Sequence, residues 1–415
     1  MVKTRPGVIE LFERTRRAGI ADTGRRALRR LSERMDVESL DFPLLTEDIA
    51  DSARMRARAG IEGHRGAGPL TVGWVCTPPK PGSGGHTTLF RMVEALEAAG
   101  HRCVIFLYDR HGGDLTRHAA VVREYWPAMK AEIRDATMGL AGADAYVASS
   151  WESAHVVAAR ATGQAALLYF IQDYEPFFHP HGTLYALAED SYRFGFRNIA
   201  LGELVSRHLT AAGVEHAVAP FGCDTDVYHL LGGAAPRSGV VYYTKPGSDR
   251  RGYLLGRLAL EEFHSRHPEV PVHLYGDAVD DWTIPVVQHH RLSPTELNRL
   301  YNRTLAGLAI SFTNITLVAE EMLAAGALPV VTEVPYARDV LPNPNVVWSP
   351  STPGALADAL SRAVEQSADV GSRALIAGSV RQGWGAAQAV VASEIAAAVM
   401  GRSADSAMLP APGQS

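Results

Sequence analysis

Short apolar runs alternate with amphipathic helical stretches along most of this 415-residue chain. In the first half, apolar runs predict strands at 71–76, 102–108, 145–149 and 166–171, and helical periodicity predicts helices at 86–99 and 152–161. In the second half, they predict strands at 240–245, 272–276, 308–312 and 328–331, and helices at 251–267, 294–302, 317–325, 354–366 and 384–400. Such alternation is typical of parallel sheets covered by helices on both faces. We therefore expect an α/β chain with two Rossmann-like domains facing across a cleft.

The first 68 residues carry no strand pattern. Apolar residues recur there at helical spacing among arginines, and residues 1–36 hold ten Lys and Arg against five Asp and Glu. We predict a basic, helical N-terminal extension that packs on the first domain. The alternative is a basic amphipathic surface that makes peripheral contact with anionic lipid heads.

Composition excludes several classes of protein. With 47% hydrophobic and 20% charged residues, the chain is of ordinary globular type. A net charge of -5 argues against a nucleic-acid binder. The three cysteines are widely spaced with no C-x-x-C pair, which argues against a disulfide framework or a structural zinc site. No apolar run approaches a membrane span, and no apolar signal core opens the chain, so we expect a cytoplasmic protein, with any membrane contact at the inner face.

The stretch from Ser311 to Val331 holds the strongest candidate for a ligand site. An apolar run ends there in the small polar cluster 313–316, and the predicted helix follows at once. At the carboxyl ends of parallel strands, free N–H groups at a helix start can hold an anion. The candidate phosphate contacts are Asn314, Thr316 and Leu317. Glu321 lies about one helical turn further on.

Charged side chains follow two other predicted strands. Asp173 and Glu175 come just after strand 166–171, where a carboxylate could assist an acceptor hydroxyl as it loses its proton; a solvated acidic turn is the alternative. Lys245 and Arg250 follow the first strand of the second domain. Surface basic residues are common, but cations placed beside the turn at 314–317 would form one anion site from two loops.

Other motifs point away from metal or nucleotide-triphosphate chemistry. The glycine-rich loop at 80–86 lacks both G-x-G-x-x-G and a P-loop lysine, which argues against dinucleotide and ATP sites. His289 and His290 adjoin each other, but no third ligand stands at metal spacing, so we predict no metal site. No G-x-S-x-G nucleophile motif occurs.

Several segments resemble those of a known family. E-M-L-A-A-G-A-L-P-V-V at 321–331 is similar to the E-A-M-A-x-G-x-P-V-V segment of retaining nucleotide-sugar glycosyltransferases with the two-domain GT-B fold, the family 4-like enzymes. A-P-F-G-C-D-T-D-V-Y at 219–228 resembles their interdomain connector. Q-D-Y-E-P at 172–176, followed by Y-A-L-A-E at 185–189, resembles a bacterial rhamnosyltransferase subgroup typified by WsaF. That likeness covers most of residues 70–365.

The resemblance implies a division of labour. We expect an acceptor domain at 69–230, a nucleotide-sugar donor domain at 238–383, a last helix at 384–400 that crosses back to the first domain, and a disordered tail at 401–415. The resemblance implies no cofactor beyond the nucleotide-sugar co-substrate.

The resemblance also implies roles for single residues. The pair Gly84 and Gly85 would approach the donor phosphate or sugar, with His86 beside it, and Glu321 would accept hydrogen bonds from the ribose. The cations at 245 and 250 would neutralise the leaving diphosphate, while Asp173 orients the acceptor. The further acceptor contacts would be Glu175 and Tyr192.

One departure bears on the donor. The family places a first Glu eight residues before the second, where this chain has Thr313. That Glu usually contacts the donor sugar, and its loss is compatible with a 6-deoxy sugar. We therefore expect transfer of rhamnose from dTDP-rhamnose to a bacterial polysaccharide or glycolipid. The alternatives are another UDP- or GDP-sugar with a small-molecule acceptor, and a nucleotide-sugar epimerase of the same fold.

Overall fold

The computed structural model describes residues 42–55, 68–232, 236–314, 316–367, 371–380 and 383–401. Residues up to Ile49 and residues from Ala50 onward form two separate units. In the described part of the first unit, Thr46–Asp48 forms a single 3-10 turn, η1. The predicted basic helices of the N-terminal extension, with their proposed membrane contact, and the predicted tail beyond residue 401 lie outside the described residues.

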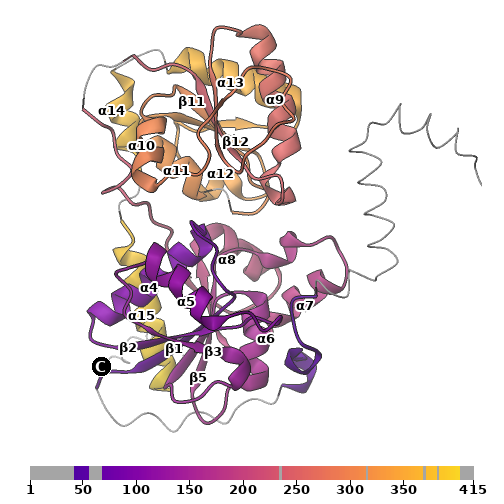
Figure 1. Ribbon diagram of the computed structural model, residues 1–415, viewed down its shortest axis with the longest axis vertical. Helices are drawn as coiled ribbons and strands as arrows, with labels where there is room; N and C mark the ends of the chain where they lie inside the picture. Colours follow the sequence, from indigo (N-terminus) through magenta and orange to yellow (C-terminus); the bar gives the residue numbers. More distant parts are fainter. Residues whose placement is uncertain are drawn as a thin grey trace, which may run out of the picture. The chain divides into compact units, whose positions relative to one another are not determined.

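The first domain is built on a seven-stranded parallel sheet, with strand order β3-β2-β1-β4-β5-β6-β7 (Figure 1). Its strands are β1 (Thr71–Cys76), β2 (Arg102–Leu107), β3 (Glu132–Asp135), β4 (Ala145–Ala148), β5 (Ala166–Ile171), β6 (Arg197–Leu201) and β7 (Ala217–Ala219). Its helices are α4 (Gly84–Ala98), α5 (Leu115–Tyr125), α6 (Trp151–Arg160), α7 (Thr183–Ser191) and α8 (Gly202–Ala211), with the 3-10 turns η2 (Ser52–Arg54), η3 (Ala136–Met138) and η4 (Glu175–Phe178). The central strands are continuous apolar runs because helices cover both faces of the sheet.

The second domain is built on a six-stranded parallel sheet, with strand order β10-β9-β8-β11-β12-β13. Its strands are β8 (Val240–Thr244), β9 (Val272–Gly276), β10 (Val287–Gln288), β11 (Ala306–Ala309), β12 (Leu328–Thr332) and β13 (Val347–Ser349). Its helices are α9 (Tyr253–Arg266), α10 (Pro294–Tyr301), α11 (Thr316–Ala324), α12 (Ala337–Val340), α13 (Pro353–Gln366) and α14 (Ser372–Ala377), with the 3-10 turn η5 (Asp249–Arg251). Each of the two sheets has its own apolar core.

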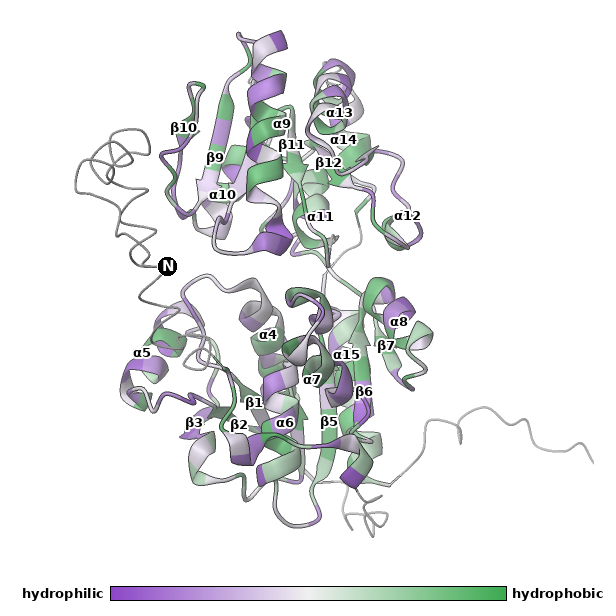
Figure 2. Ribbon diagram, turned by 90° about the vertical axis from the view of Figure 1, so that its right-hand side faces the viewer, coloured by the Kyte–Doolittle hydropathy of each residue, from purple (hydrophilic) through white to green (hydrophobic). Residues whose placement is uncertain are grey.

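The last helix of the described chain, α15 (Gly385–Val399), belongs to the core of the first domain. Val391 and Ile395 are buried in the same apolar cluster as strands β1, β4 and β5. Trp384, just before the helix, lies under the guanidinium of Arg91 from α4 at 5.0 Å. In Figure 2 the apolar side of α15 faces the first sheet, beside α4 and β7. After forming the second domain, the chain therefore returns to the first.

The prediction of two Rossmann-like parallel-sheet domains is confirmed by these sheets. Some element boundaries were wrong. Helix α4 begins at Gly84, so the glycine pair forms its first turn instead of ending the loop before it. Strand β11 ends at Ala309, because the backbone N–H of Phe312 donates to Arg250 (3.0 Å) and the Ser311 carbonyl accepts from Thr332, which takes this segment out of the strand ladder.

Among the described residues, no helix combines the length and the apolar character that a membrane crossing requires.

Candidate functional site

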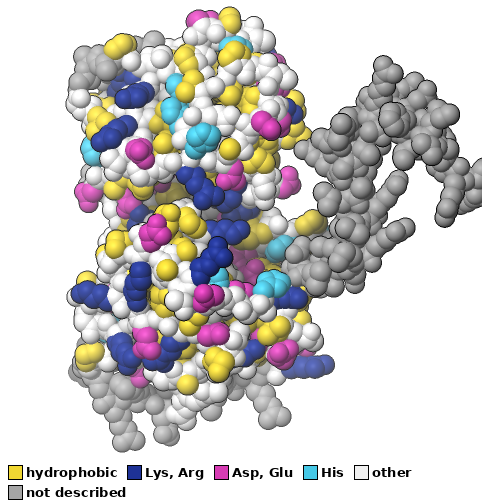
Figure 3. Space-filling model, in the orientation of Figure 1, with side chains coloured by type: hydrophobic (Ala, Val, Ile, Leu, Met, Phe, Trp, Pro, Cys, Tyr) yellow, Lys and Arg dark blue, Asp and Glu magenta, His cyan; other side chains and the backbone are white. Residues whose placement is uncertain are grey.

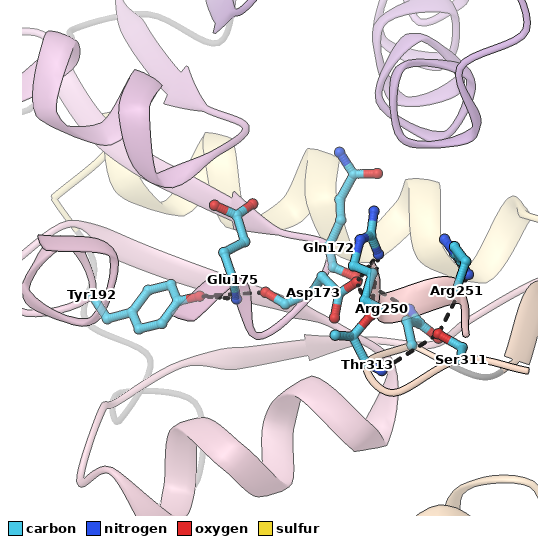
Figure 4. A network of polar contacts seen from close by, with 9 residues as sticks. Gln172, Asp173, Glu175, Tyr192, Arg250, Arg251, Ser311 and Thr313 are labelled. Atoms are coloured by element: carbon cyan, nitrogen blue, oxygen red, sulfur yellow. Dashed lines mark hydrogen bonds and ion pairs between the residues drawn. The ribbon is translucent and has the colours of Figure 1, made fainter. Parts of the chain in front are cut away.

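Three segments that follow strands meet at the carboxyl edges of the two sheets. Asp173 follows β5, Arg250 lies in η5 after β8, and Thr313 follows β11. The guanidinium Nη1 of Arg250 lies 3.2 Å from Asp173 Oδ2 and 3.1 Å from Thr313 Oγ1. The Thr313 hydroxyl donates to the same Asp173 oxygen at 2.9 Å. A closed triangle of three side chains, one from the first domain and two from the second, results (Figure 4).

The triangle is shielded from solvent, which changes the proton affinities of its members. Burial raises the pKa of Asp173, and the charge of Arg250 and the hydrogen bond from Thr313 oppose that rise. Burial also lowers the pKa of Arg250, as does the neighbouring charge of Arg251. The Arg250 guanidinium stacks over the ring of Phe178 at 4.2 Å, so one face of the cation is already covered. A charge pair held this way keeps its geometry without water.

Two further cations lie beside the triangle. Arg251 Nη1 donates to Ser311 Oγ at 3.4 Å. Lys245 is exposed. Its pKa is lowered, first by desolvation and then by the charges of Arg251 and Arg250. Besides burial, like charges lower the pKa of Lys245 and of Arg250, and cations grouped in this way form a region that favours an anion. Lys and Arg side chains gather at this level of the molecule in Figure 3.

The turn before α11 lies against the first domain. The Asn314 side-chain amide donates to the backbone carbonyl of Gln172 at 3.2 Å. Leu317 packs against the apolar core of the first domain. Thr316 is the first residue of α11, and its side chain lies outside the described part of the structure. The predicted phosphate turn is therefore next to both Asp173 and the cations.

The glycine pair lies at the same place, at the start of α4. Gly84 and Gly85 are both exposed. A Cβ at Gly84 would lie 4.0 Å from the Leu317 side chain, and one at Gly85 would lie 3.9 Å from the Gln172 amide oxygen. These are ordinary van der Waals contacts, so close packing does not require glycine at either position. Because neither residue has a side chain, the backbone at the start of α4 is exposed. His86 is held by Ser83 Oγ (2.8 Å) and the Thr77 carbonyl (2.9 Å), and burial lowers its pKa.

The two predicted acceptor contacts, Glu175 and Tyr192, point into the interior of the first domain. Glu175 is 4% exposed, and its carboxylate accepts from the backbone N–H of Trp151 and from the Tyr169 hydroxyl at 3.1 Å. Burial, and then the charge of Glu152, raise its pKa well above the ordinary range. Tyr192 is also buried, and its hydroxyl accepts from the Glu175 N–H at 2.9 Å. Neither side chain is open to an acceptor here; both fix the backbone that carries Asp173.

Glu321 lies inside the second domain on α11 and is 8% exposed. Burial raises its pKa to about 8, while the charge of Arg91 lowers it and that of Glu320 raises it further. Arg91 comes from the first domain, where it forms an ion pair with Asp224. The predicted ribose ligand is therefore a carboxyl that holds its proton at neutral pH in the absence of a donor.

The histidine pair of the second domain does not assemble a metal centre. His289 Nε2 lies 3.0 Å from His273 Nδ1, and burial lowers the pKa of both imidazoles. No group of three His, Cys, Asp or Glu side chains is arranged for a metal ion within the described ranges.

Three side chains of the site escaped the sequence-based reasoning. The ring of Phe178 packs against the Arg250 guanidinium, and Ser311 accepts a hydrogen bond from Arg251. The positive charge of Arg91 lowers the pKa of Glu321. Ser311 and Phe178 each lie within a few residues of a predicted site residue that follows a strand. Their position in the sequence, shortly after a strand, could therefore have pointed to them. Arg91 lies mid-helix in α4, and nothing in its sequence context pointed to the site.

Comparison with known proteins gives three kinds of match. A family model described as "WsaF, N-terminal domain" matches residues 126–203. The O-antigen biosynthesis protein RfbC of Myxococcus xanthus is 30% identical over 362 residues, which is 83% of this chain and 28% of that protein. The chain thus spans less than a third of the length of this relative.

Solved structures share the architecture. HepE of Anabaena, in complex with UDP and glucose, matches with a TM-score of 0.57 and 16% identity over 80% of this chain and 97% of its own. WaaG, a glycosyltransferase involved in lipopolysaccharide biosynthesis, matches with a TM-score of 0.53 and 14% identity over 78% and 99%. A putative UDP-N-acetylglucosamine 2-epimerase of Listeria monocytogenes matches with a TM-score of 0.54 and 10% identity over 80% and 96%. At these identities the likeness shows the fold, and that fold is GT-B, as the sequence segments predicted.

Proposed function

We propose that this chain is a glycosyltransferase that moves a sugar from a nucleotide-sugar donor to a growing bacterial polysaccharide or glycolipid. The observation that carries the proposal is the triangle of Asp173, Arg250 and Thr313, with Lys245 and Arg251 beside it. It joins an anion site on one Rossmann-like domain to a buried carboxylate on the other. The similarity to an O-antigen biosynthesis protein supports the polysaccharide acceptor.

In the proposed mechanism, cationic side chains of the protein stabilise the leaving diphosphate. Lys245, Arg250 and Arg251 bind the donor diphosphate together with the start of α11, and they stabilise the negative charge that grows on it as the glycosidic bond breaks. These charges take the place of a metal ion. Fixed charges in a site without water are more effective than the same charges in solution.

The carboxylates have separate tasks in this mechanism. Glu321 accepts hydrogen bonds from the ribose hydroxyls. Asp173 orients the acceptor hydroxyl, and the leaving phosphate takes the acceptor proton, as the resemblance to retaining enzymes implies. In the absence of donor, Asp173 holds Arg250 in place. A bound diphosphate then shares this guanidinium, which leaves the carboxylate free for the acceptor.

For the donor, we propose dTDP-rhamnose. The support is the WsaF-like segment over 126–203 and the Thr at position 313, where a Glu that contacts hexose donors stands in related enzymes. A UDP-sugar is the alternative, since HepE is described in complex with UDP and glucose. The free, buried cysteines Cys76, Cys103 and Cys223 fit a reducing compartment, so we place the reaction in the cytoplasm.

The test is a thermal-shift and calorimetric panel of dTDP-rhamnose, dTDP-glucose, UDP-glucose, UDP-N-acetylglucosamine and GDP-mannose, with and without a chelator. A ligand that binds the folded state must raise its stability by mass action. Selective stabilisation by dTDP-rhamnose that survives the chelator supports the donor and the metal-free site. Preference for a UDP- or GDP-sugar removes rhamnose and keeps the transferase.

The alternative function is that of a nucleotide-sugar epimerase, since the putative epimerase of Listeria monocytogenes shares this fold. An epimerase needs no acceptor. Incubation of each bound nucleotide sugar without any alcohol, followed by NMR of the sugar ring, therefore separates the two activities. Quantitative conversion to an isomer would replace the transferase proposal.

A further inference from the structure

A strip of aromatic rings crosses between the two domains beside the candidate site. We define the aromatic strip as Phe177 on η4, His208 on α8 and Tyr336 at the start of α12. The Phe177 and His208 ring centroids are 5.0 Å apart, and those of His208 and Tyr336 are 5.4 Å apart. Tyr174 lies under the first two at 4.9 Å and 5.1 Å. Helices α8 and α12 contact each other, and Figure 2 shows them facing one another from the two domains.

The two end rings of the strip remain open to solvent. Phe177 is 42% exposed and Tyr336 is 39% exposed, although both belong to large apolar residue types. Burial lowers the pKa of His208, which favours the neutral form of the central ring. Exposed aromatic surface on a folded protein, in contact with polar groups, is typical of binding surfaces.

Charged side chains border the strip. The Arg207 guanidinium lies 5.9 Å from the centre of the Tyr336 ring and 3.9 Å from the Asp339 carboxylate. Both members of this ion pair are at least half exposed. The rings meet edge to face, so their exposed parts form an angled apolar surface, and the ion pair at its border offers hydrogen-bond donors and acceptors. A ligand suited to this surface has an apolar face and polar groups around its rim, and a pyranose ring has both.

Tyr336 adopts a backbone conformation that a tyrosine rarely takes. Its φ is 67°, in the left-handed region that favours glycine. Such a conformation is strained for a residue other than glycine, and it persists where the surrounding structure or a function requires it. The ring meets His208 of the other domain edge to face, at an interplanar angle of 73°, so this backbone conformation holds the ring against the strip.

The strip is continuous with the candidate reaction site. Phe177 is followed by Phe178, which carries the Arg250 guanidinium, and both residues belong to η4 after Asp173. Phe177 lies four residues after Asp173 along the chain, on the domain to which the proposed mechanism assigns the acceptor.

We propose that the aromatic strip is an acceptor subsite that stacks one sugar ring of the incoming saccharide, with Arg207 and Asp339 bonded to its hydroxyls. The inference rests on the proposed function and adds to it the chemical class of the acceptor at this position. An aliphatic lipid chain fits less well, because the exposed surface consists of rings and is bordered by an ion pair. Because the strip joins the two domains, a bound saccharide also stabilises their closed arrangement.

The experiment is saturation-transfer NMR with four defined probes: the methyl glycosides of α-L-rhamnose, α-D-glucose, α-D-galactose and α-D-mannose. We expect the ring C–H protons of at least one probe to receive saturation from the wild-type protein. The signal should fall at least threefold in Phe177→Ala and in Tyr336→Gly. Tyr336→Phe should keep it, and Tyr125→Ala, which removes an exposed ring on α5, should leave it unchanged.

The Tyr336→Gly variant separates a loss of saccharide binding from a loss of folding stability. Glycine adopts φ near 67° without strain, so this variant should melt no lower than the wild type while it loses the saccharide signal. A merely structural ring would give the opposite result, with lower stability and an unchanged signal, and that would overturn the proposal. So would the absence of saturation transfer to all four probes.

Other outcomes separate this inference from its premise. Thermal shifts with dTDP and UDP should be the same in wild type and strip variants. If saccharide binding depends on the strip but no nucleotide binds, the acceptor subsite stands and the transferase does not. If Tyr336→Gly instead abolishes flotation with phosphatidylglycerol vesicles and no glycoside binds, the strip is a lipid surface and the saccharide proposal is wrong.

Discussion

Glu321 should make the protein less stable as the pH rises through neutrality. Burial raises the pKa of this carboxyl from 4.5 to about 8. Between those two values, the unfolded chain has lost the proton that the folded chain keeps. A raised carboxyl pKa therefore contributes stability that is fully present below about pH 4.5 and is lost as the pH approaches 8. Each pH unit is worth about 1.4 kcal/mol, so the loss between pH 4.5 and pH 7 is about 3 kcal/mol.

The assay is urea unfolding of wild type and Glu321→Gln between pH 5 and pH 8.5. The glutamine cannot ionise, so the variant lacks this part of the pH dependence. We expect the two proteins to differ least near pH 5, and the variant to gain relative stability up to about pH 8 and no further. Glu365→Gln, an exposed change of the same charge on α13, is the matched control and should follow the wild type at every pH.

A difference between wild type and Glu321→Gln that stays constant over this range would refute the reasoning, since it would mean that Glu321 is ionised in the folded state. The same variant also tests the proposed ribose contact. If the carboxyl accepts hydrogen bonds from ribose hydroxyls, nucleotide affinity should fall by about tenfold with the amide in place, because the amide NH2 group cannot accept a hydrogen bond where the second carboxyl oxygen can.

The remaining predictions concern the cations, the triangle and the interdomain connector. Lys245→Ala should lower turnover by about 100-fold with an unchanged circular dichroism spectrum, because it removes a charge placed on the leaving group; near-normal turnover would remove Lys245 from the mechanism. Thr313→Val should cost about 1–3 kcal/mol in urea unfolding, since the hydroxyl bonds both Asp173 and Arg250 and the valine leaves them without it; an unchanged unfolding midpoint would contradict this. Gly222→Ala should lower the melting temperature by several degrees, because its Cβ would lie 2.2 Å from the Gly383 carbonyl oxygen and one backbone must move; a thermal-shift scan decides it.

Most strands that the sequence predicted are apolar runs inside the sheets, although one buried inner strand, β6, was missed. Strands β1 and β5 are continuous apolar runs in the middle of their sheet, and their bounds match the pattern closely. Strand β3, Glu132–Asp135, lies at the sheet edge and has three charged residues among its four, so it carries no apolar signal. Edge strands pair on one side only, and charge protects them from further pairing. Hydrophobic periodicity therefore cannot reveal them.

The candidate site was predictable to the extent that it follows strand ends. Asp173, Arg250 and the turn at 313–314 each come directly after a strand, and parallel sheets gather such segments at one edge. The direction of each side chain was not predictable. Glu175 lies two residues beyond Asp173 and turns inward, because the Trp151 N–H and the Tyr169 hydroxyl bind its carboxylate there. Those partners come from α6 and β5, and only the tertiary fold brings them together.

The threonine at position 313 and the aspartate at position 173 form one arrangement. The glycosyltransferases that this chain resembles carry a glutamate where Thr313 stands. Here the Thr313 hydroxyl donates to Asp173 at 2.9 Å, and both residues contact the same guanidinium nitrogen of Arg250. A carboxylate at 313 would face the buried carboxylate of Asp173 and compete with it for Arg250, since like charges at hydrogen-bond distance cannot both stay ionised in a dry site. The Thr313 hydroxyl instead donates a hydrogen bond to the Asp173 carboxylate, and Asp173 remains the ion-pair partner of Arg250. Arg250 of the second domain thus takes its carboxylate partner, Asp173, from the first domain, while position 313 supplies a neutral hydroxyl.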